Sequence, residues 1–160
     1  MTPPARMPSR AVTDISDATL QRFAGYRMKR AFNVIRDDLH LVLKPFDLRM
    51  LTYTALVLIV DNPGLRQAQL ADAMDVERPN VVVIVDELEQ RGLIVRDPAP
   101  NDRRAYALNP TPAGEHLCAT ALTAVERHEE RLMAGIDAET RAAMFAGLEA
   151  IRRGSDRRVK

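Results

Sequence analysis

The stretch that decides the fold runs from Leu65 to Thr111 and reads LRQAQLADAMDVERPNVVVIVDELEQRGLIVRDPAPNDRRAYALNPT. Its first half has the apolar spacing of two short helices separated by a turn. Gly92 is placed to end the second helix, and the β-branched residues after it favour a strand. Residues 97–102 contain two prolines and an Asn-Asp pair, which predict a loop, and residues 104–108 predict the return strand. We therefore expect a helix, a turn, a second helix and a β-hairpin in that order.

The two short helices give this segment its expected role. The first spans residues 67–74, and the second begins near Arg78 with proline tolerated in its first turn. A helix pair followed by a strand pair of this size is the plan of a winged helix-turn-helix, which sets one helix in the major groove of DNA and the hairpin tip along the neighbouring minor groove. Val82 and Val83 fall on the outward flank of the second helix. There they either meet thymine methyl groups or pack against the wing or a neighbouring helix. The residues expected to face the core are Val81, Ile84, Val85 and Leu88.

Longer helices flank the segment on both sides. Residues 17–43 carry two apolar stripes, so one face can pack on its own domain and the other on a partner. Residues 48–60 are apolar almost all round, with Asp47 as their N-cap, and predict the most buried element. Residues 112–134 begin at a Thr-Pro pair that is typical of a helix start.

A last helix is expected over residues 138–153, capped by Asp137. Its inward face is expected to hold Ala142, Phe145, Leu148 and Ile151. The predicted organisation is a flexible arm over residues 1–16, a dimerisation helix over 17–45, a winged helix-turn-helix domain over 46–111, C-terminal dimerisation helices over 112–153 and a basic tail over 154–160.

The composition bounds the function classes. The chain has 160 residues, 46% of them hydrophobic, with no tryptophan and a net charge of +1. No apolar run reaches the roughly 18 residues that a membrane span requires, and the first ten residues lack the apolar core of a signal peptide. A single cysteine excludes an intrachain disulfide, and a cytoplasmic protein is expected. Basic residues gather in two places, between Arg91 and Arg104 and in the last nine residues. We interpret the last nine residues as a solvated, frayed terminus.

Three parts of the chain carry a family resemblance. They are Leu70-Ala71, the run Leu88-Glu89-Gln90-Arg91-Gly92-Leu93-Ile94, and the wing Asp102-Arg103-Arg104 followed by Leu108, Thr111 and Gly114. With this spacing, residues 17–153 resemble the MarR family of bacterial winged-helix transcription regulators. The resemblance implies a mainly α fold with a small β-hairpin wing (α+β) and dimerisation helices at both ends. It also implies an obligate homodimer that binds a pseudo-palindromic operator on double-stranded DNA, usually as a repressor, and that a small ligand releases.

The resemblance also suggests which residues contact DNA. Arg78 and Asn80 match the start of the recognition helix, where Asn can pair with adenine and Arg with guanine or a phosphate. Arg103 matches the wing-tip arginine of the minor groove, and Asp102 matches the acidic residue that holds this arginine by charge-assisted hydrogen bonds. Arg104 matches a position that contacts the DNA backbone.

Two glutamines and two departures from the family complete the expected DNA surface. Gln67 and Gln69, in the first turn of the short helix, are candidate phosphate contacts. Val82 and Val83 stand where the family usually has a polar pair, so the base contacts there cannot be carried over. Pro110 replaces the usual apolar residue before the next helix and is expected to shorten the return strand.

Five side chains are candidate ligand contacts: Tyr26, Arg30, Arg49, Met50 and Tyr53. In the family's layout they fall where the first two helices border the usual pocket, and an arginine beside tyrosines suits an aromatic carboxylate. Residues 25–31 and 77–80 resemble the branch of the family linked to hydroxycinnamate breakdown, whose signal is an aromatic acid or its coenzyme A thioester. The alternative is that these side chains make dimer and core contacts.

Other functions stay open as alternatives. Cys118 is expected to be a small core residue, although some relatives sense oxidants through a cysteine, so a sensor of an oxidant or of a phenolic drug is an alternative. His116 and Cys118 do not have zinc-site spacing, so neither a metal nor a cofactor is expected, with metal sensing through ligands on different helices as an alternative. The sequence has no glycine-rich phosphate loop, nucleophile elbow or HExxH motif, so an enzyme is not expected. A helical dimer adaptor that binds no DNA would not require the Asp-Arg-Arg wing.

Overall fold

The computed structural model describes residues 15–99 and 102–156, and leaves the side chains of residues 99, 102–105 and 155–156 outside the description. Most of the predicted N-terminal arm and the end of the basic tail therefore lie outside the described residues. The chain divides into two compact units, residues 1–35 and 36–160. Helix α1 (Ala24–Leu43) begins in the first unit and ends in the second.

In the first unit, α1 starts later than the sequence predicts. A short 3-10 helix, η1 (Leu20–Arg22), precedes it, so residues 17–43 are not one continuous helix. The Asp17 carboxylate explains the break, because it accepts hydrogen bonds from the Gln21 side chain (2.9 Å) and from the Tyr26 hydroxyl (2.7 Å). These bonds fold the segment back over the first turn of α1.

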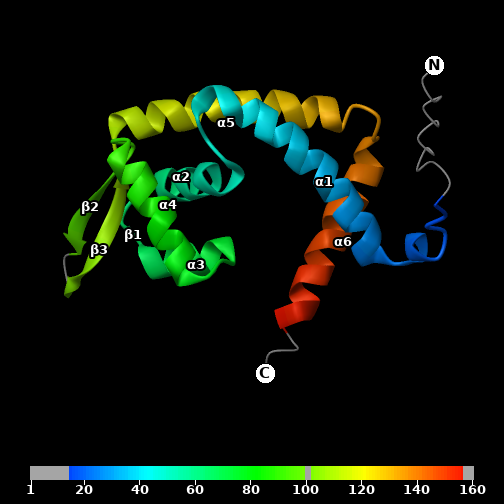
Figure 1. Cartoon of the computed structure of the whole chain (residues 1–160), viewed down its shortest axis with the longest axis horizontal. Coiled ribbons are helices and arrows are strands. Elements are labelled where there is room, and N and C mark those ends of the chain that lie inside the picture. The colour runs from blue at the N-terminus through cyan, green and yellow to red at the C-terminus, as the bar shows by residue number, and fades with distance from the viewer. Residues whose placement is uncertain (1–14, 100–101, 157–160) are drawn as a thin grey trace, which may run out of the picture. The chain divides into compact units, whose positions relative to one another are not determined.

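The second unit is built around a buried helix, α2 (Met50–Asp61). It contacts α3 (Gln67–Met74), α4 (Arg78–Gln90) and α5 (Pro112–Leu132), and Figure 1 shows α5 passing above it. Their shared core contains Ala55, Leu56, Ile59, Leu70, Ala71, Val81, Ile84, Val85, Leu88, Leu93, Ile94, Leu108 and Cys118. The bounds predicted for α3 are confirmed, as are the start of α4 and the four residues expected on its inner face.

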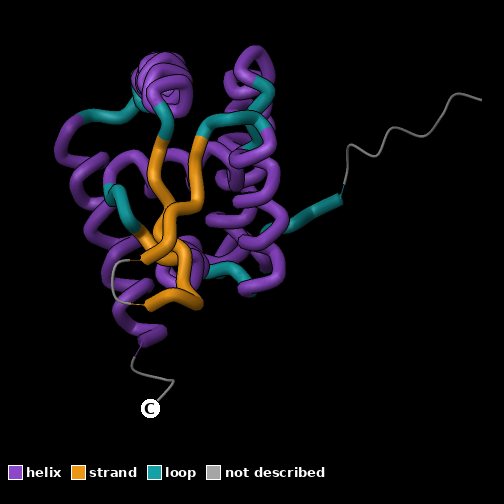
Figure 2. Tube along the Cα trace, turned by 90° about the vertical axis from the view of Figure 1, so that its left-hand side faces the viewer, coloured by secondary structure: helices purple, strands orange, loops and turns teal. Residues whose placement is uncertain are grey.

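The wing is a three-stranded antiparallel sheet rather than a hairpin alone. Strands β2 (Ile94–Ala99) and β3 (Asp102–Pro110) pair over most of their length, and β1 (Leu65–Arg66) adds to the other edge of β3 (Figure 2). The predicted loop over residues 97–102 is wrong for residues 97–99 and 102, because Asp97 and Pro98 pair with Ala107 and Tyr106 and Asp102 begins β3, whereas residues 100–101 lie outside the described residues. Pro110 does not shorten β3 either, since it pairs with Ile94.

The connector between α1 and α2 (residues 44–49) also differs from the prediction. A 3-10 helix, η2 (Lys44–Phe46), follows α1, and Asp47 ends it in the left-handed region at φ +52°. Asp47 therefore does not cap α2. The N-cap is Arg49, whose backbone N–H donates to the Thr52 hydroxyl (2.9 Å). A side chain in the third helical position thus satisfies the donor that Asp47 was expected to serve.

Thr111 links the end of α4 to the start of α5 through hydrogen bonds. Gly92 follows α4 at φ +66°, as predicted for a residue that ends a helix. The Thr111 hydroxyl donates to the Gly92 carbonyl (2.7 Å) and accepts from the Gly114 N–H (3.1 Å), which caps α5. These bonds fix the start of α5 against the end of α4.

The last helix, α6 (Ala138–Asp156), is capped by Asp137 as predicted, through a hydrogen bond from the Thr140 N–H (2.8 Å). Its expected inward face is not covered, because Phe145, Leu148 and Ile151 are all exposed. In the part of the chain that the structure describes, no helix has both the length and the apolar character that a membrane crossing requires.

Candidate functional site

The outer face of α4 combines polar and apolar side chains. Arg78 and Asn80 are exposed in its first turn. Val82 and Val83 are 42% and 64% exposed, so neither is covered by the wing or by a neighbouring helix within the chain. A helix with this surface presents hydrogen-bonding groups at its start and methyl groups along its flank, which are the chemistries that read base edges in a major groove.

An arginine of β2 helps to hold the wing against α4. Arg96 of β2 forms ion pairs with Asp86 and with Glu89 (2.6 Å to the latter), both on α4. The Arg96 side chain is 22% exposed, so these pairs are partly shielded from solvent and from salt. The backbone of residues 102–104 lies at the start of β3, beyond this attachment, whereas the side chains of Asp102, Arg103 and Arg104 lie outside the description.

The start of α3 uses one of its two glutamines internally. The Gln69 side-chain oxygen accepts from the Arg66 backbone N–H (3.0 Å), which provides the cap that the sequence lacked. Gln67 is half-buried and Gln69 is exposed. Gln69 therefore stabilises the helix start.

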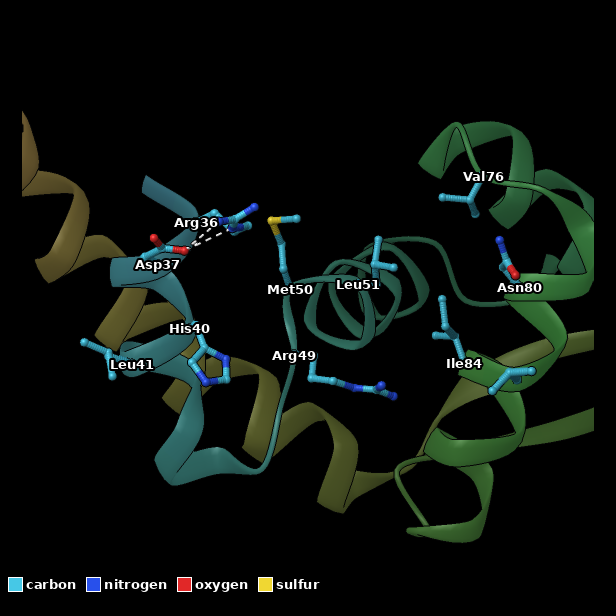
Figure 3. A pocket seen from close by; sticks show the side chains of 11 residues that line it. Arg36, Asp37, His40, Leu41, Arg49, Met50, Leu51, Val76, Asn80 and Ile84 are labelled. Carbon is cyan, nitrogen blue, oxygen red and sulfur yellow. Dashed lines mark hydrogen bonds and ion pairs between the residues drawn. The ribbon is translucent and has the colours of Figure 1, made fainter. Parts of the chain in front are cut away.

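A cavity of about 800 Å³ lies between the end of α1, the start of α2 and α4 (Figure 3). Its lining residues are Arg36, Asp37, His40, Leu41, Arg49, Met50, Leu51, Val76, Asn80, Val83 and Ile84. The volume is within the range of small-molecule sites. Five aliphatic side chains and one methionine form most of the wall, and three basic side chains stand among them.

The charged residues of the cavity are arranged in two pairs. Arg36 and Asp37 of α1 form an exposed ion pair (2.9 Å). Arg49 forms an ion pair with Glu87 of α4, a residue that is not among the lining residues, and Figure 3 shows the His40 ring below Arg36. A molecule with an apolar body and an anionic end fits this distribution, because the body can contact the aliphatic wall while the anion meets an arginine.

Comparison with known proteins gives the family. Residues 48–106 match the model of the MarR family. The transcriptional repressor CouR bound to a 23-mer DNA duplex is 33% identical and superimposes with a TM-score of 0.83, covering 88% of this chain and 99% of that one. CouR from Rhodococcus jostii RHA1 bound to p-coumaroyl-CoA is 31% identical with a TM-score of 0.76, covering 85% and 95%. This chain belongs to the MarR family.

A curated relative adds a regulatory context. A protein of Thauera aromatica, described as a proposed transcriptional regulatory protein for the hcr operon, is 42% identical over 101 residues. The match spans 63% of this chain and 61% of that relative, so it covers less than two thirds of the relative's length. This MarR-family chain is a DNA-binding transcriptional regulator and not an enzyme, and the predicted family and fold class are confirmed.

The structure brings together only part of the predicted ligand set of this MarR-family chain. Arg49 and Met50 line the cavity. Tyr53 instead packs with Leu43, Leu48 and Ala121 in a second apolar cluster, and burial there raises the pKa of its hydroxyl. Tyr26 and Arg30 belong to the first unit, where the hydrogen bond from the Tyr26 hydroxyl holds the pKa of Asp17 below its ordinary value.

The sequence pattern did not single out Arg36, Asp37 and His40. One signal was present, because Arg36 and His40 are four residues apart and so share one face of a helix. Neither residue belongs to the apolar stripes of residues 17–43, and those stripes carry the sequence prediction for this helix. The place of Arg36, Asp37 and His40 in the cavity depends on the turn of the α1–α2 connector, which local sequence rules do not predict.

Cys118 has the place expected of a core residue. It is 5% exposed and belongs to the main core cluster of the MarR-family fold. Burial raises the pKa of its thiol, with a further contribution from the charge of Asp61. A protonated, enclosed thiol reacts slowly with oxidants, because the thiolate is the reactive form.

Proposed function

We propose that this MarR-family protein is a cytoplasmic repressor that binds a pseudo-palindromic operator as a homodimer and is released by an aromatic acid or its coenzyme A thioester. The observation that carries the proposal is the wall shared by the cavity and the recognition helix. Asn80, Val83 and Ile84 of α4 line the cavity, and α4 also carries the candidate base contacts. A ligand in the cavity therefore touches the helix that reads DNA.

The DNA contacts proposed for this repressor come from three places. Arg78, Asn80, Val82 and Val83 contact base edges from α4, Gln67 and Gln69 contact phosphates from α3, and Asp102, Arg103 and Arg104 act from the wing. The exposure of the four α4 residues supports the first group. The attachment of β2 to α4 through Arg96 supports joint use of wing and helix, because it fixes their separation.

The homodimer is supported by uncovered apolar side chains in the terminal helices. In the first unit, Phe23, Phe32 and Val34 are exposed, and in the second unit Phe145 and Ile151 of α6 are exposed. A single soluble chain rarely leaves so many large apolar side chains in contact with water. A second copy that covers them would also supply the second recognition helix, roughly 34 Å away, that a palindromic operator requires.

The ligand class is supported by the chemistry of the cavity and by CouR, which is described as bound to p-coumaroyl-CoA. A planar aromatic acyl group suits the aliphatic wall, and its carboxylate or thioester end would lie near Arg36, His40 or Arg49. A coenzyme A moiety is long and similar in volume to the whole cavity, so with the acyl group inside it would extend out of the cavity. Its phosphates would then meet the arginines at the rim.

Operator release tests the proposal directly. The DNA upstream of the protein's own gene, labelled for fluorescence anisotropy, is titrated with the protein in the presence of p-coumaroyl-CoA, p-coumarate or free coenzyme A. We expect p-coumaroyl-CoA or p-coumarate to weaken binding at least about tenfold, within the usual range of coupling between sites, and coenzyme A alone to have little effect. Binding that none of the three weakens, or release by an unrelated phenol alone, would overturn the ligand class.

The salt dependence of DNA affinity tests separately whether the protein binds DNA at all. The logarithm of the affinity should fall linearly with the logarithm of the salt concentration, because phosphate contacts release counterions. A chain that binds no DNA even at low salt would favour the helical adaptor instead.

A further inference from the structure

Arg49 occupies an unusual position, because it serves the cavity and the recognition helix at once. It is the N-cap residue of α2 and lines the cavity. Figure 3 shows its side chain reaching from the connector toward α4. There it forms an ion pair with Glu87. One guanidinium is thus available both to a bound ligand and to α4.

Glu87 lies on the same face of α4 as the cavity wall. Asn80, Val83, Ile84 and Glu87 follow the three- and four-residue spacing that puts side chains on one side of a helix. The first three line the cavity, and Glu87 continues their stripe by one turn. The carboxylate is therefore at the end of the cavity wall, held there by Arg49.

The pair is accessible to a competing anion. The Arg49 side chain is 68% exposed and the Glu87 side chain 28% exposed. An ion pair that faces water contributes little stability, so a carboxylate or phosphate with two oxygens can replace Glu87 on the guanidinium fork. After the exchange, Glu87 would be unpaired and close to a second negative charge.

A second arginine attaches the end of α4 to the connector and determines which part of the helix can move. Arg91, the residue that follows α4, donates to the backbone carbonyls of Asp47 (2.6 Å) and Phe46 (3.0 Å) in the connector. This attachment does not involve the cavity, so a ligand leaves it in place. Glu87 lies in the last turn of α4, one turn before Arg91, so loss of the Arg49–Glu87 pair would leave Arg91 as the pivot at this end of the helix. The half that moves is the N-terminal half, which carries Arg78 and Asn80.

We propose that Arg49 couples ligand binding to DNA release by exchanging partners. In the ligand-free protein it holds Glu87 and keeps α4 in the orientation that binds DNA. When a ligand is bound it pairs with the ligand's anionic group, and α4 pivots about its attachment at Arg91. This inference rests on the proposed function, since it requires an anionic ligand in the cavity.

The decisive variant is Glu87→Gln. It removes a negative charge from the DNA-binding lobe, so electrostatics alone predicts tighter operator binding. Partner exchange predicts the opposite sign, with operator binding weakened about threefold by loss of an exposed pair. It also predicts that p-coumaroyl-CoA, used as the probe, binds the free protein about threefold more tightly, because its competitor for Arg49 is gone.

Arg49→Gln and the double variant complete the cycle. Arg49→Gln should weaken p-coumaroyl-CoA binding about tenfold, the size expected for a lost charged hydrogen bond. In both single variants, the ratio of operator dissociation constants with and without p-coumaroyl-CoA should shrink. The double variant should be no worse than Arg49→Gln, because the two residues act as one unit. Circular dichroism confirms that each variant is folded.

Glu149→Gln is the matched control. Glu149 forms exposed ion pairs with arginines of α6, so its substitution removes the same charge outside the cavity and α4. The Glu149→Gln variant should keep the wild-type ratio of operator dissociation constants with and without p-coumaroyl-CoA. If Glu87→Gln also keeps the wild-type ratio, or leaves p-coumaroyl-CoA affinity unchanged, partner exchange is wrong while the proposed function stands. If neither p-coumaroyl-CoA nor p-coumarate releases the wild-type protein, the proposed ligand class fails, and the role of Arg49 fails with it.

Discussion

At the scale of single residues, the helical period settled which side chains of α4 face outward but not what they do there. Val82 and Val83 were expected on the outer flank, and both are exposed. Asp47 shows the opposite outcome. Its short polar side chain suggested a helix cap, yet the chain uses its tolerance of the left-handed region to end η2. The two roles favour the same residue type, so local sequence could not separate them.

Val82 allows a test of contact between a valine and the thymine methyl groups of the operator. Because Val82 does not line the cavity, its substitution should not change ligand binding directly. Val82→Ala should weaken binding to the operator about fivefold, the value of one or two lost methyl contacts, and leave binding to unrelated DNA unchanged. Competition anisotropy with specific and unrelated duplexes measures both. An equal loss on the two duplexes would mean that Val82 supports the fold or the backbone contacts and reads no base.

At the scale of elements, strongly periodic helices were predictable and the sheet was not. The bounds of α3 follow from apolar spacing within a few residues. The wing depends on pairing between distant segments. Leu65 pairs with Leu108, and Asp97 pairs with Ala107. Prolines and an Asn-Asp pair argue for a loop locally, but β3 supplies a partner for the strand, and pairing with a distant strand overrides a local preference.

The junction of α4 and α5 gives a sharp prediction at this scale. A Cβ added at Gly114 would lie 1.9 Å from the Leu93 carbonyl oxygen, which is backbone and cannot move aside. Gly114→Ala should therefore destabilise the fold by about 3 kcal/mol, the upper end of the usual penalty for overpacking. Urea unfolding followed by circular dichroism measures the loss.

Gly147→Ala is the control for this substitution. Gly147 also lies in a helix, but nothing stands within 4 Å of a Cβ added there. Alanine should stabilise α6 by roughly 0.5–1 kcal/mol, because glycine is the poorer helix former. If both variants lose stability to the same extent, close packing at Gly114 is not the reason for its glycine.

At the scale of the whole molecule, the chain carries apolar faces that it does not cover itself. The sequence predicted an inward face on α6 from its periodicity, and that face exists, but in the chain it is exposed. Periodicity identifies a face that must be buried and does not say whether the covering surface belongs to the same chain. Among the periodic patterns, the two stripes of residues 17–43 pointed to a partner, in agreement with the homodimer that the family resemblance implies.

Leu148 tests whether a second copy covers the α6 face. Leu148→Glu places a charge in the middle of the exposed stripe formed with Phe145 and Ile151, where a dimer interface would have to desolvate it. Because Leu148 is already 43% exposed, the chain should remain folded. Light scattering after gel filtration should show a monomer, and operator affinity should fall about a hundredfold as the two recognition helices become independent.

Ala143→Glu is the control, because the period of 3.6 residues puts the same charge on the opposite side of α6, and this variant should remain a dimer. A Leu148→Glu protein that stays dimeric and binds the operator normally would show that this face of α6 lies outside the interface.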